Sequence, residues 1–191
     1  MKKTIINLSL IFAFLIIYFL QANLFVSFKI VGVMPNLFVI LILFIGLYSG
    51  RIMGVTYGIT LGMLIDLFIG KKIGIAAISL GVIGFLGGEF DKNFSKESRL
   101  TIILMVAVST IIYETISYIL SYFIGGNYIQ IKAFVKILLI EAFYNILITI
   151  ILYPLIQNSG YKIENEYKGK VWAKILIKEG GLWKIKCAEI Y

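Results

Sequence analysis

The chain has 191 residues, of which 60% are hydrophobic and 15% are charged, and its mean hydropathy is +0.97. A water-soluble domain of this size needs a far more polar surface, so the composition excludes a soluble fold and favours a chain that folds in lipid. The sequence contains one cysteine and no histidine. A disulfide framework and a thiolate or imidazole metal site are therefore excluded, and we expect no cofactor.

The net charge of +8 would suit a nucleic-acid-binding protein, but its distribution does not. The lysines and arginines lie at the ends of apolar segments and in the C-terminal region. This arrangement is typical of membrane topology rather than of a nucleic-acid surface. With the N-terminus in the cytoplasm, most basic residues fall on the cytoplasmic side, so we expect both termini there.

Six apolar segments predict six transmembrane helices, because about 20 residues cross the roughly 30 Å of hydrocarbon. We expect one transmembrane domain over residues 1–157, and its helices lie near 4–24, 34–49, 52–69, 73–89, 100–124 and 134–157. The second and fourth segments are short and would need snorkelling side chains or local thinning of the bilayer. The predicted fold class is an all-α membrane protein, a six-transmembrane-helix bundle.

The first segment has some features of a secretory signal peptide, since Lys2 and Lys3 precede an apolar core. Its apolar stretch is too long, however, and no small-residue cleavage site follows it. We therefore expect a retained first helix.

Glycine recurs at every fourth position in the second and third segments. The ladder consists of Gly46, Gly50, Gly54, Gly58 and Gly62; Asp66 takes the next position, and Gly70 and Gly74 continue the spacing. Four residues advance a helix by about 400°, so ladder members within one helix share a slowly turning stripe. In lipid such a stripe lets a neighbouring helix approach closely. A lone pair of glycines would indicate only generic packing, whereas a ladder of five ending in a carboxylate is less common.

Met34-Pro35-Asn36-Leu37 opens the second helix, Gly62-Met63-Leu64-Ile65-Asp66 closes the third, and Gly70, Gly74 and Ala77 follow. Together with the ladder, these motifs resemble the signature of the MreD family over residues 34–88. The number of spans agrees with the family, as do Asn145 and Pro154 in the last helix.

The resemblance implies a non-enzymatic component of the cell-wall elongation complex, located in the bacterial inner membrane. It implies the bitopic protein MreC as a direct partner. It also implies indirect association with the actin-like MreB, the glycosyltransferase RodA and a class B penicillin-binding protein. A fold similar to the substrate-binding components of energy-coupling-factor vitamin transporters is a further implication.

Three acidic residues lie inside the predicted spans: Asp66, Glu114 and Glu141. An isolated charge at the centre of a bilayer costs at least about 2.5–3.5 kcal/mol, so each should face the bundle interior, water or a partner. With the N-terminus in the cytoplasm, all three fall in the outer leaflet. Together with Asn145 they form a candidate polar cavity or partner contact; the alternative is a packing seam satisfied internally.

The last two predicted helices carry polar stripes at helical spacing. The stripes comprise Thr110, Tyr113, Glu114, Ser117, Tyr118 and Ser121 on one helix, and Glu141, Tyr144, Asn145, Thr149 and Tyr153 on the other. They predict a hydrogen-bonded seam between these two helices.

Two other functions stay open. A vitamin-binding component of an energy-coupling-factor transporter would carry small residues four apart in its first helix, whereas Ala13 and Ala22 are nine apart. An intramembrane enzyme is the third candidate, but no histidine, cysteine nucleophile or phosphate-binding loop accompanies the acids.

Residues 158–191 form a predicted basic cytoplasmic tail. Alternating lysines and apolar residues over 174–178 and 182–186 flank Gly180 and Gly181, which suggests a β-hairpin. A segment lying on anionic lipid headgroups fits equally well, and a solvated extension is the third possibility.

Overall fold

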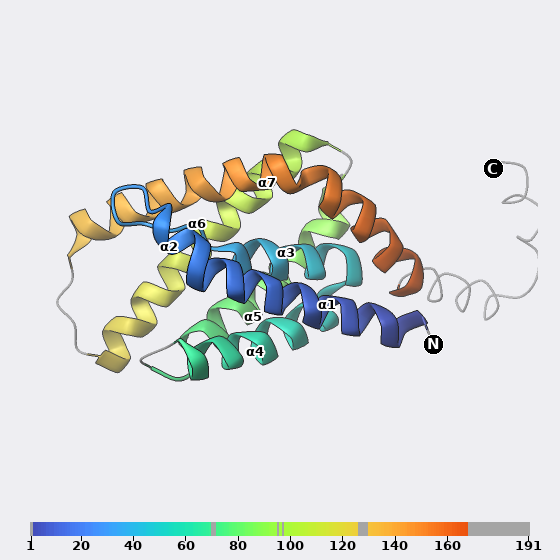
Figure 1. The fold of residues 1–191 in the computed structure, drawn as a ribbon, viewed down its shortest axis with the longest axis horizontal. Helices are drawn as coiled ribbons and strands as arrows, with labels where there is room; N and C mark the ends of the chain where they lie inside the picture. The colour runs from blue at the N-terminus through green and yellow to red at the C-terminus, as the bar shows by residue number, and fades with distance from the viewer. Residues whose placement is uncertain (1, 70–71, 95, 97, 126–129, 168–191) are drawn as a thin grey trace, which may run out of the picture.

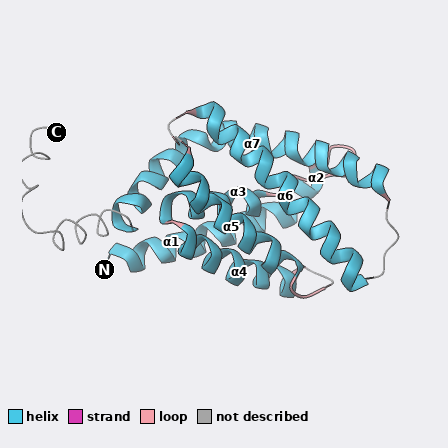
Figure 2. Ribbon diagram, turned by 180° about the vertical axis from the view of Figure 1, so that it is seen from behind, coloured by secondary structure: helices cyan, strands magenta, loops and turns pink. Residues whose placement is uncertain are grey.

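The computed structural model describes residues 2–69, 72–94, 96, 98–125 and 130–167. Its helices are α1 (Lys2–Phe19), the π-helix η1 (Leu20–Leu24), α2 (Phe25–Ser27), α3 (Leu37–Ser49), α4 (Arg51–Phe68), α5 (Ile75–Asn93), α6 (Arg99–Gly125) and α7 (Ile131–Tyr167) (Figure 1). Because α1, η1 and α2 follow one another without a break, they form one segment, and the described chain has six helical segments. Figure 2 shows helices and loops only, with no β-strand in the described part.

Four segments are long and apolar enough to cross a membrane, namely Lys3–Ser27, Arg51–Phe68, Arg99–Ile124 and Ile131–Tyr167. Large hydrophobic side chains such as Phe12, Leu104 and Ile151 are exposed on their outer faces. Such a surface is unfavourable in water and suits the hydrocarbon of a bilayer. The predicted all-α membrane bundle is confirmed.

Successive segments run in opposite directions, so the start of α1 and the end of α7 lie at the same end of the bundle (Figure 1). We call this the terminal end; it also holds the α3–α4 and α5–α6 connections. The opposite, distal end holds the α4–α5 and α6–α7 connections. At the terminal end, the Lys3 ammonium group lies over the Tyr167 ring and joins the start of α1 to the end of α7. At the distal end, Lys72 in the α4–α5 connection donates a hydrogen bond to the Ser121 carbonyl of α6.

The central helix is α3. Eleven of its residues are buried, from Leu37 to Tyr48 with the exception of Leu41. α3 contains no charged residue and is hydrophobic on all sides. Such a helix is stable when it lies in the interior of a bundle. It is surrounded by the other helices and supplies most of the hydrophobic core.

A single residue, Gly50, connects α3 to α4. Its φ of 91° lies in the region that side chains other than glycine rarely adopt, so Gly50 reverses the chain instead of packing against a neighbouring helix. The Gly50 N–H donates to the Gly46 carbonyl at 2.9 Å and closes the last turn of α3. One member of the ladder is thus a turn residue.

The other ladder residues within α4 bring it directly onto the backbone of α5. A Cβ atom added to Gly62 would lie 2.6 Å from the Cα of Ala77, and one added to Gly58 would lie 2.9 Å from the Cα of Gly81. A Cβ on Gly54 would overlap the carbonyl oxygen of Gly84. Such close backbone approach strengthens dispersion contacts and permits Cα–H···O contacts. The pair α4–α5 is therefore the most tightly packed in the bundle.

The last helix, α7, continues to Tyr167, beyond the expected end at 157, so residues 158–167 of the predicted tail are helical. Pro154 lies inside α7 and cannot donate a backbone hydrogen bond, and α7 bends in its second half (Figure 1). The expected hairpin over 174–186 and the ladder residue Gly70 lie outside the described residues.

Candidate functional site

Asp66, near the end of α4, caps the beginning of α5. Its two carboxylate oxygens accept hydrogen bonds from the N–H groups of Gly74 (2.9 Å), Ala76 (3.0 Å) and Ala77 (3.1 Å). These are donors that no carbonyl within the helix can satisfy, and a negative charge is favourable at the positive end of the helix dipole. The backbone of Gly74 has a φ of 102°, which turns the chain into α5. Asp66 and Gly74 thus secure the α4–α5 connection.

Asn145 on α7 joins three helices in the interior. Its Oδ1 accepts the backbone N–H of Asn36 at 2.8 Å, and its Nδ2 donates to the hydroxyl of Thr110 on α6 at 3.0 Å. Both Asn145 and Thr110 are fully buried. The predicted seam between the last two helices is present, and it also reaches the start of α3.

The start of α3 is shaped by Pro35 and Asn36. Asn36 is the N-cap residue, and its side-chain oxygen accepts from the Val39 N–H at 3.4 Å. The backbone N–H of Asn36 is then free to reach Asn145. Pro35 is buried just before the cap and has no N–H of its own to satisfy.

Glu114 on α6 and Glu141 on α7 form a second level of the same seam. Their carboxyl groups interact with each other. Glu114 lies one turn after Thr110, and Glu141 lies one turn before Asn145, as expected for antiparallel helices in register. Glu141 is 6% exposed, and its Oε1 has no hydrogen-bond partner in the described structure.

A cleft of about 340 Å³ opens beside this carboxyl pair, between α6 and α7 on the distal side. It is lined by Glu114, Ser117, Tyr118, Ser121, Gln130, Ala133, Phe134 and Ile137. The Tyr118 hydroxyl is buried and has no described partner, while its ring lies 4.4 Å from that of Phe134. The Ser117 hydroxyl donates to Ser79 at 3.0 Å and links the cleft wall to α5.

The cleft therefore combines the partly buried carboxyl group of Glu114, which interacts with the buried Glu141 behind it, with hydroxyl groups and an amide. Lys72, whose ammonium group donates to the Ser121 carbonyl at 3.1 Å, stands at its edge. Such a set can bind a hydrogen-bond donor or a cation.

The described contacts of Asp66 all go to α5, so the structure brings Glu114, Glu141 and Asn145 together in one seam and places Asp66 in another role. Among the described residues no three metal-ligating side chains cluster.

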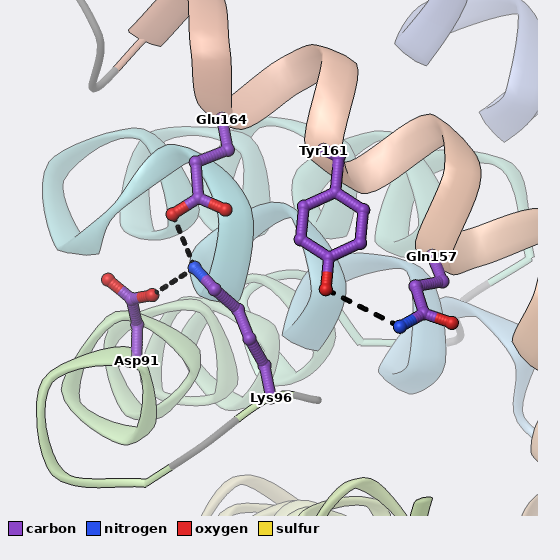
Figure 3. Close-up of polar contacts among 5 residues, drawn as sticks. All are labelled: Asp91, Lys96, Gln157, Tyr161 and Glu164. Atoms are coloured by element: carbon purple, nitrogen blue, oxygen red, sulfur yellow. Dashed lines mark hydrogen bonds and ion pairs between the residues drawn. The ribbon is translucent and has the colours of Figure 1, made fainter. Parts of the chain in front are cut away.

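At the terminal end, Lys96 bridges two helices (Figure 3). Its ammonium group contacts the Asp91 carboxylate of α5 at 2.7 Å and the Glu164 carboxylate of α7. Burial acts to lower the pKa of Lys96, but the hydrogen bonds and charges of Asp91 and Glu164 outweigh it and raise that pKa. Lys96 therefore stays charged and holds the α5–α6 connection against α7.

The same end contains a glycine contact that the sequence spacing did not indicate. Gly160 on α7 lies against the Tyr48 ring, and a Cβ at this position would overlap the ring. Tyr161 packs edge-on to Tyr48 with ring centroids 6.0 Å apart, and its hydroxyl accepts from Gln157 at 3.4 Å (Figure 3). The sequence shows a glycine about one and a half turns after Pro154, but it does not indicate that this glycine contacts Tyr48.

The fold and the seam define an all-α, multi-pass membrane protein with buried polar links between its helices. The profile of the family described as rod shape-determining protein MreD matches residues 1–158, which include every described helix up to the second half of α7. The chain belongs to the MreD family and is a rod shape-determining membrane protein. No curated protein and no solved structure matches it significantly, so the expected likeness to energy-coupling-factor transporter components stays a prediction.

Proposed function

We propose that this protein is a non-catalytic component of the cell-wall elongation complex in the bacterial inner membrane, and that it regulates cell shape by binding MreC. The family match across the transmembrane bundle carries this proposal. MreB, RodA and a class B penicillin-binding protein would then associate indirectly through the complex.

The distribution of basic residues supports an orientation with both termini in the cytoplasm. Lys3, Arg51, Lys96 and Arg99 belong to segments at the terminal end, where α7 also ends. Arg51 pairs with Glu89 at 2.9 Å there. By the positive-inside rule, this end faces the cytoplasm and the α6–α7 cleft lies toward the outer leaflet.

The α6–α7 cleft, with a volume of about 340 Å³, is the proposed contact for a side chain of the partner's transmembrane helix, while the helix itself lies outside the cleft. A donor or a basic side chain from that helix would pair with Glu114, which lines the cleft and interacts with the Glu141 carboxyl group behind it. Interhelical hydrogen bonds in lipid contribute about 0.6–2 kcal/mol, enough to select one helix among many. The non-catalytic assignment is supported by the family match, since the family is described as rod shape-determining.

The experiment is depletion of the protein in its own cells, followed by complementation with variants. We expect rods to become round, wild-type protein to restore the shape and co-purify MreC, and Glu114→Gln with Glu141→Gln to lose both. Glu89→Gln, the same chemical change at the terminal end, is the matched control and should retain both. Normal cell shape after depletion would contradict the proposed role in cell-wall elongation. Unchanged MreC recovery with the double variant would contradict the assignment of the cleft as the MreC contact.

The alternative is a small-molecule carrier, which the cleft volume of about 340 Å³ favours because ligand pockets begin near 300 Å³. A vitamin retained by the purified protein would replace the proposal above. Vitamin-free protein with normal partner recovery would support the scaffold.

A further inference from the structure

A second cavity lies between α1 and the rest of the bundle, on the side away from the α4–α5 pair. It has a volume of about 370 Å³ and is enclosed by α1, α3 and α7. Its walls are predominantly apolar, with Ala13 from α1, Leu41 and Phe44 from α3, and Leu152 and Ile156 from α7. We call it the α1 groove.

The groove exists because α1 touches the bundle through few side chains. Of the α1 side chains that the structure describes, only Leu10 and Phe14 are buried, and the Phe14 ring packs on Phe38 with ring centroids 5.4 Å apart. An empty apolar space loses dispersion contacts along its walls, and water does not favour such a space. In a bilayer, the medium available to fill it is hydrocarbon.

The size of the groove distinguishes a hydrocarbon chain from a helix. A helix with its side chains is about 10–12 Å wide, so three turns of it need on the order of 1,000 Å³ or more. The groove provides about 370 Å³. If a methylene group takes roughly the 30 Å³ of a water molecule, this space holds about a dozen methylenes, close to one acyl chain.

Polar groups gather at one end of the groove. Ser9, Tyr48 and Ser159 are among its lining residues, and they lie toward the terminal ends of α1, α3 and α7. Tyr48 is 1% exposed, and its hydroxyl has no described hydrogen-bond partner. Lys3, one to two turns before Ser9 on α1, lies over the Tyr167 ring outside the lining of the groove and brings a positive charge to this end. This end suits an anionic headgroup, while the remainder suits its hydrocarbon.

We propose that the α1 groove binds one acyl chain of an anionic phospholipid, with the headgroup at the terminal end. The chain fills the space that α1, α3 and α7 leave between them and fixes the position of α1 against the bundle. The site is separate from the α6–α7 cleft and does not depend on the identity of the protein partner.

The test uses the full-length protein reconstituted in vesicles that contain phosphatidylglycerol with a photoreactive diazirine in its acyl chain. We expect crosslinks on groove residues such as Leu41 and Ile156. Ala13→Phe fills the groove with a ring and should reduce these crosslinks by about tenfold, since the added volume removes the space that the chain needs. Ala22→Phe makes the same change at an exposed position and should leave them unchanged.

Ala13→Leu is a milder filling variant that keeps the test decisive if Ala13→Phe does not fold, and it should reduce crosslinking by several-fold. Equal labelling of groove residues in wild type and both filling variants would overturn the proposal. For the headgroup, labelling by phosphatidylcholine with the same tail should be weaker, and Lys3→Gln should remove the difference. Equal labelling by both lipids in the wild type would overturn the headgroup assignment.

Discussion

Asn145 accepts a hydrogen bond from the backbone N–H of Asn36 at 2.8 Å, although the two residues are 109 positions apart. The same side chain donates to Thr110, so one amide joins the start of α3 to both α6 and α7. A buried backbone donor in lipid has no water to fall back on, and this link therefore decides where the α6–α7 pair sits against the central helix.

Replacing Asn145 with Leu should destabilise the bundle by about 1–3 kcal/mol, because it leaves the buried Asn36 N–H without its acceptor and removes the interhelical donor to Thr110, whose hydroxyl keeps only its bond to the Val106 carbonyl. The measurement is the thermal midpoint of the detergent-purified protein. Asn23→Ala is the control, since its amide bonds an exposed carbonyl within the same helix. Equal midpoints for both variants would refute the role given to Asn145.

Asp66→Asn should destabilise the α4–α5 connection by a similar amount, about 1–3 kcal/mol. An amide keeps one acceptor oxygen for three N–H donors and loses the charge that favours the helix N-terminus. We expect faster proteolysis near residues 69–74, with MreC recovery lowered only in proportion to the amount of folded protein. A normal protease pattern together with a specific loss of MreC would instead place Asp66 in the partner contact.

Gly58→Leu should prevent α4 from reaching α5. Even a Cβ atom at this position would lie 2.7 Å from the carbonyl carbon of Leu80, so the two helices must separate. We expect a loss of more than about 2 kcal/mol or aggregation, seen as a shifted peak in size-exclusion chromatography. Thr60→Leu adds a similar side chain to an exposed face of the same helix and should behave as wild type.

Lys96→Met should lower stability by about 1–3 kcal/mol, because Asp91 and Glu164 are then left facing each other without the ammonium group. The pKa of Lys96 is raised in the folded protein, so its contribution is fully present below the usual value of 10.5 and is lost as pH rises through the higher folded value. The difference in thermal midpoint between wild type and Lys96→Met should be constant from pH 7 to about pH 10 and shrink above it. A difference that grows with pH would show that another group carries the effect.

The sequence predicted the elements far better than their neighbours. Composition and segment length were sufficient for six helices, because the thickness of the hydrocarbon layer fixes how long an apolar segment must be. The polar stripes led correctly to the α6–α7 seam, since helical spacing shows which side chains share a face. The ladder likewise showed which face of α4 is bare.

Spacing cannot show what meets a face. Nothing near Gly58 in the sequence indicates Leu80 and Gly81 as its neighbours, and Lys96 and Glu164 are 68 positions apart. The same four-residue interval placed Gly50 in the ladder, but its positive φ makes it a turn. Asp66 continued the spacing as well, and the donors that it satisfies became visible only once α5 was placed beside α4.

The one-residue connection at Gly50 has a consequence for how the chain enters the membrane. α3 has 13 residues and therefore rises about 20 Å, less than the roughly 30 Å thickness of the hydrocarbon layer. With one residue between them, the end of α3 and the start of α4 stay next to each other. We therefore expect α3 and α4 to insert into the membrane together as a helical hairpin. The longer α4 would compensate for α3, which is too short to partition into the bilayer by itself. The enclosed position of α3 would then be established during biogenesis.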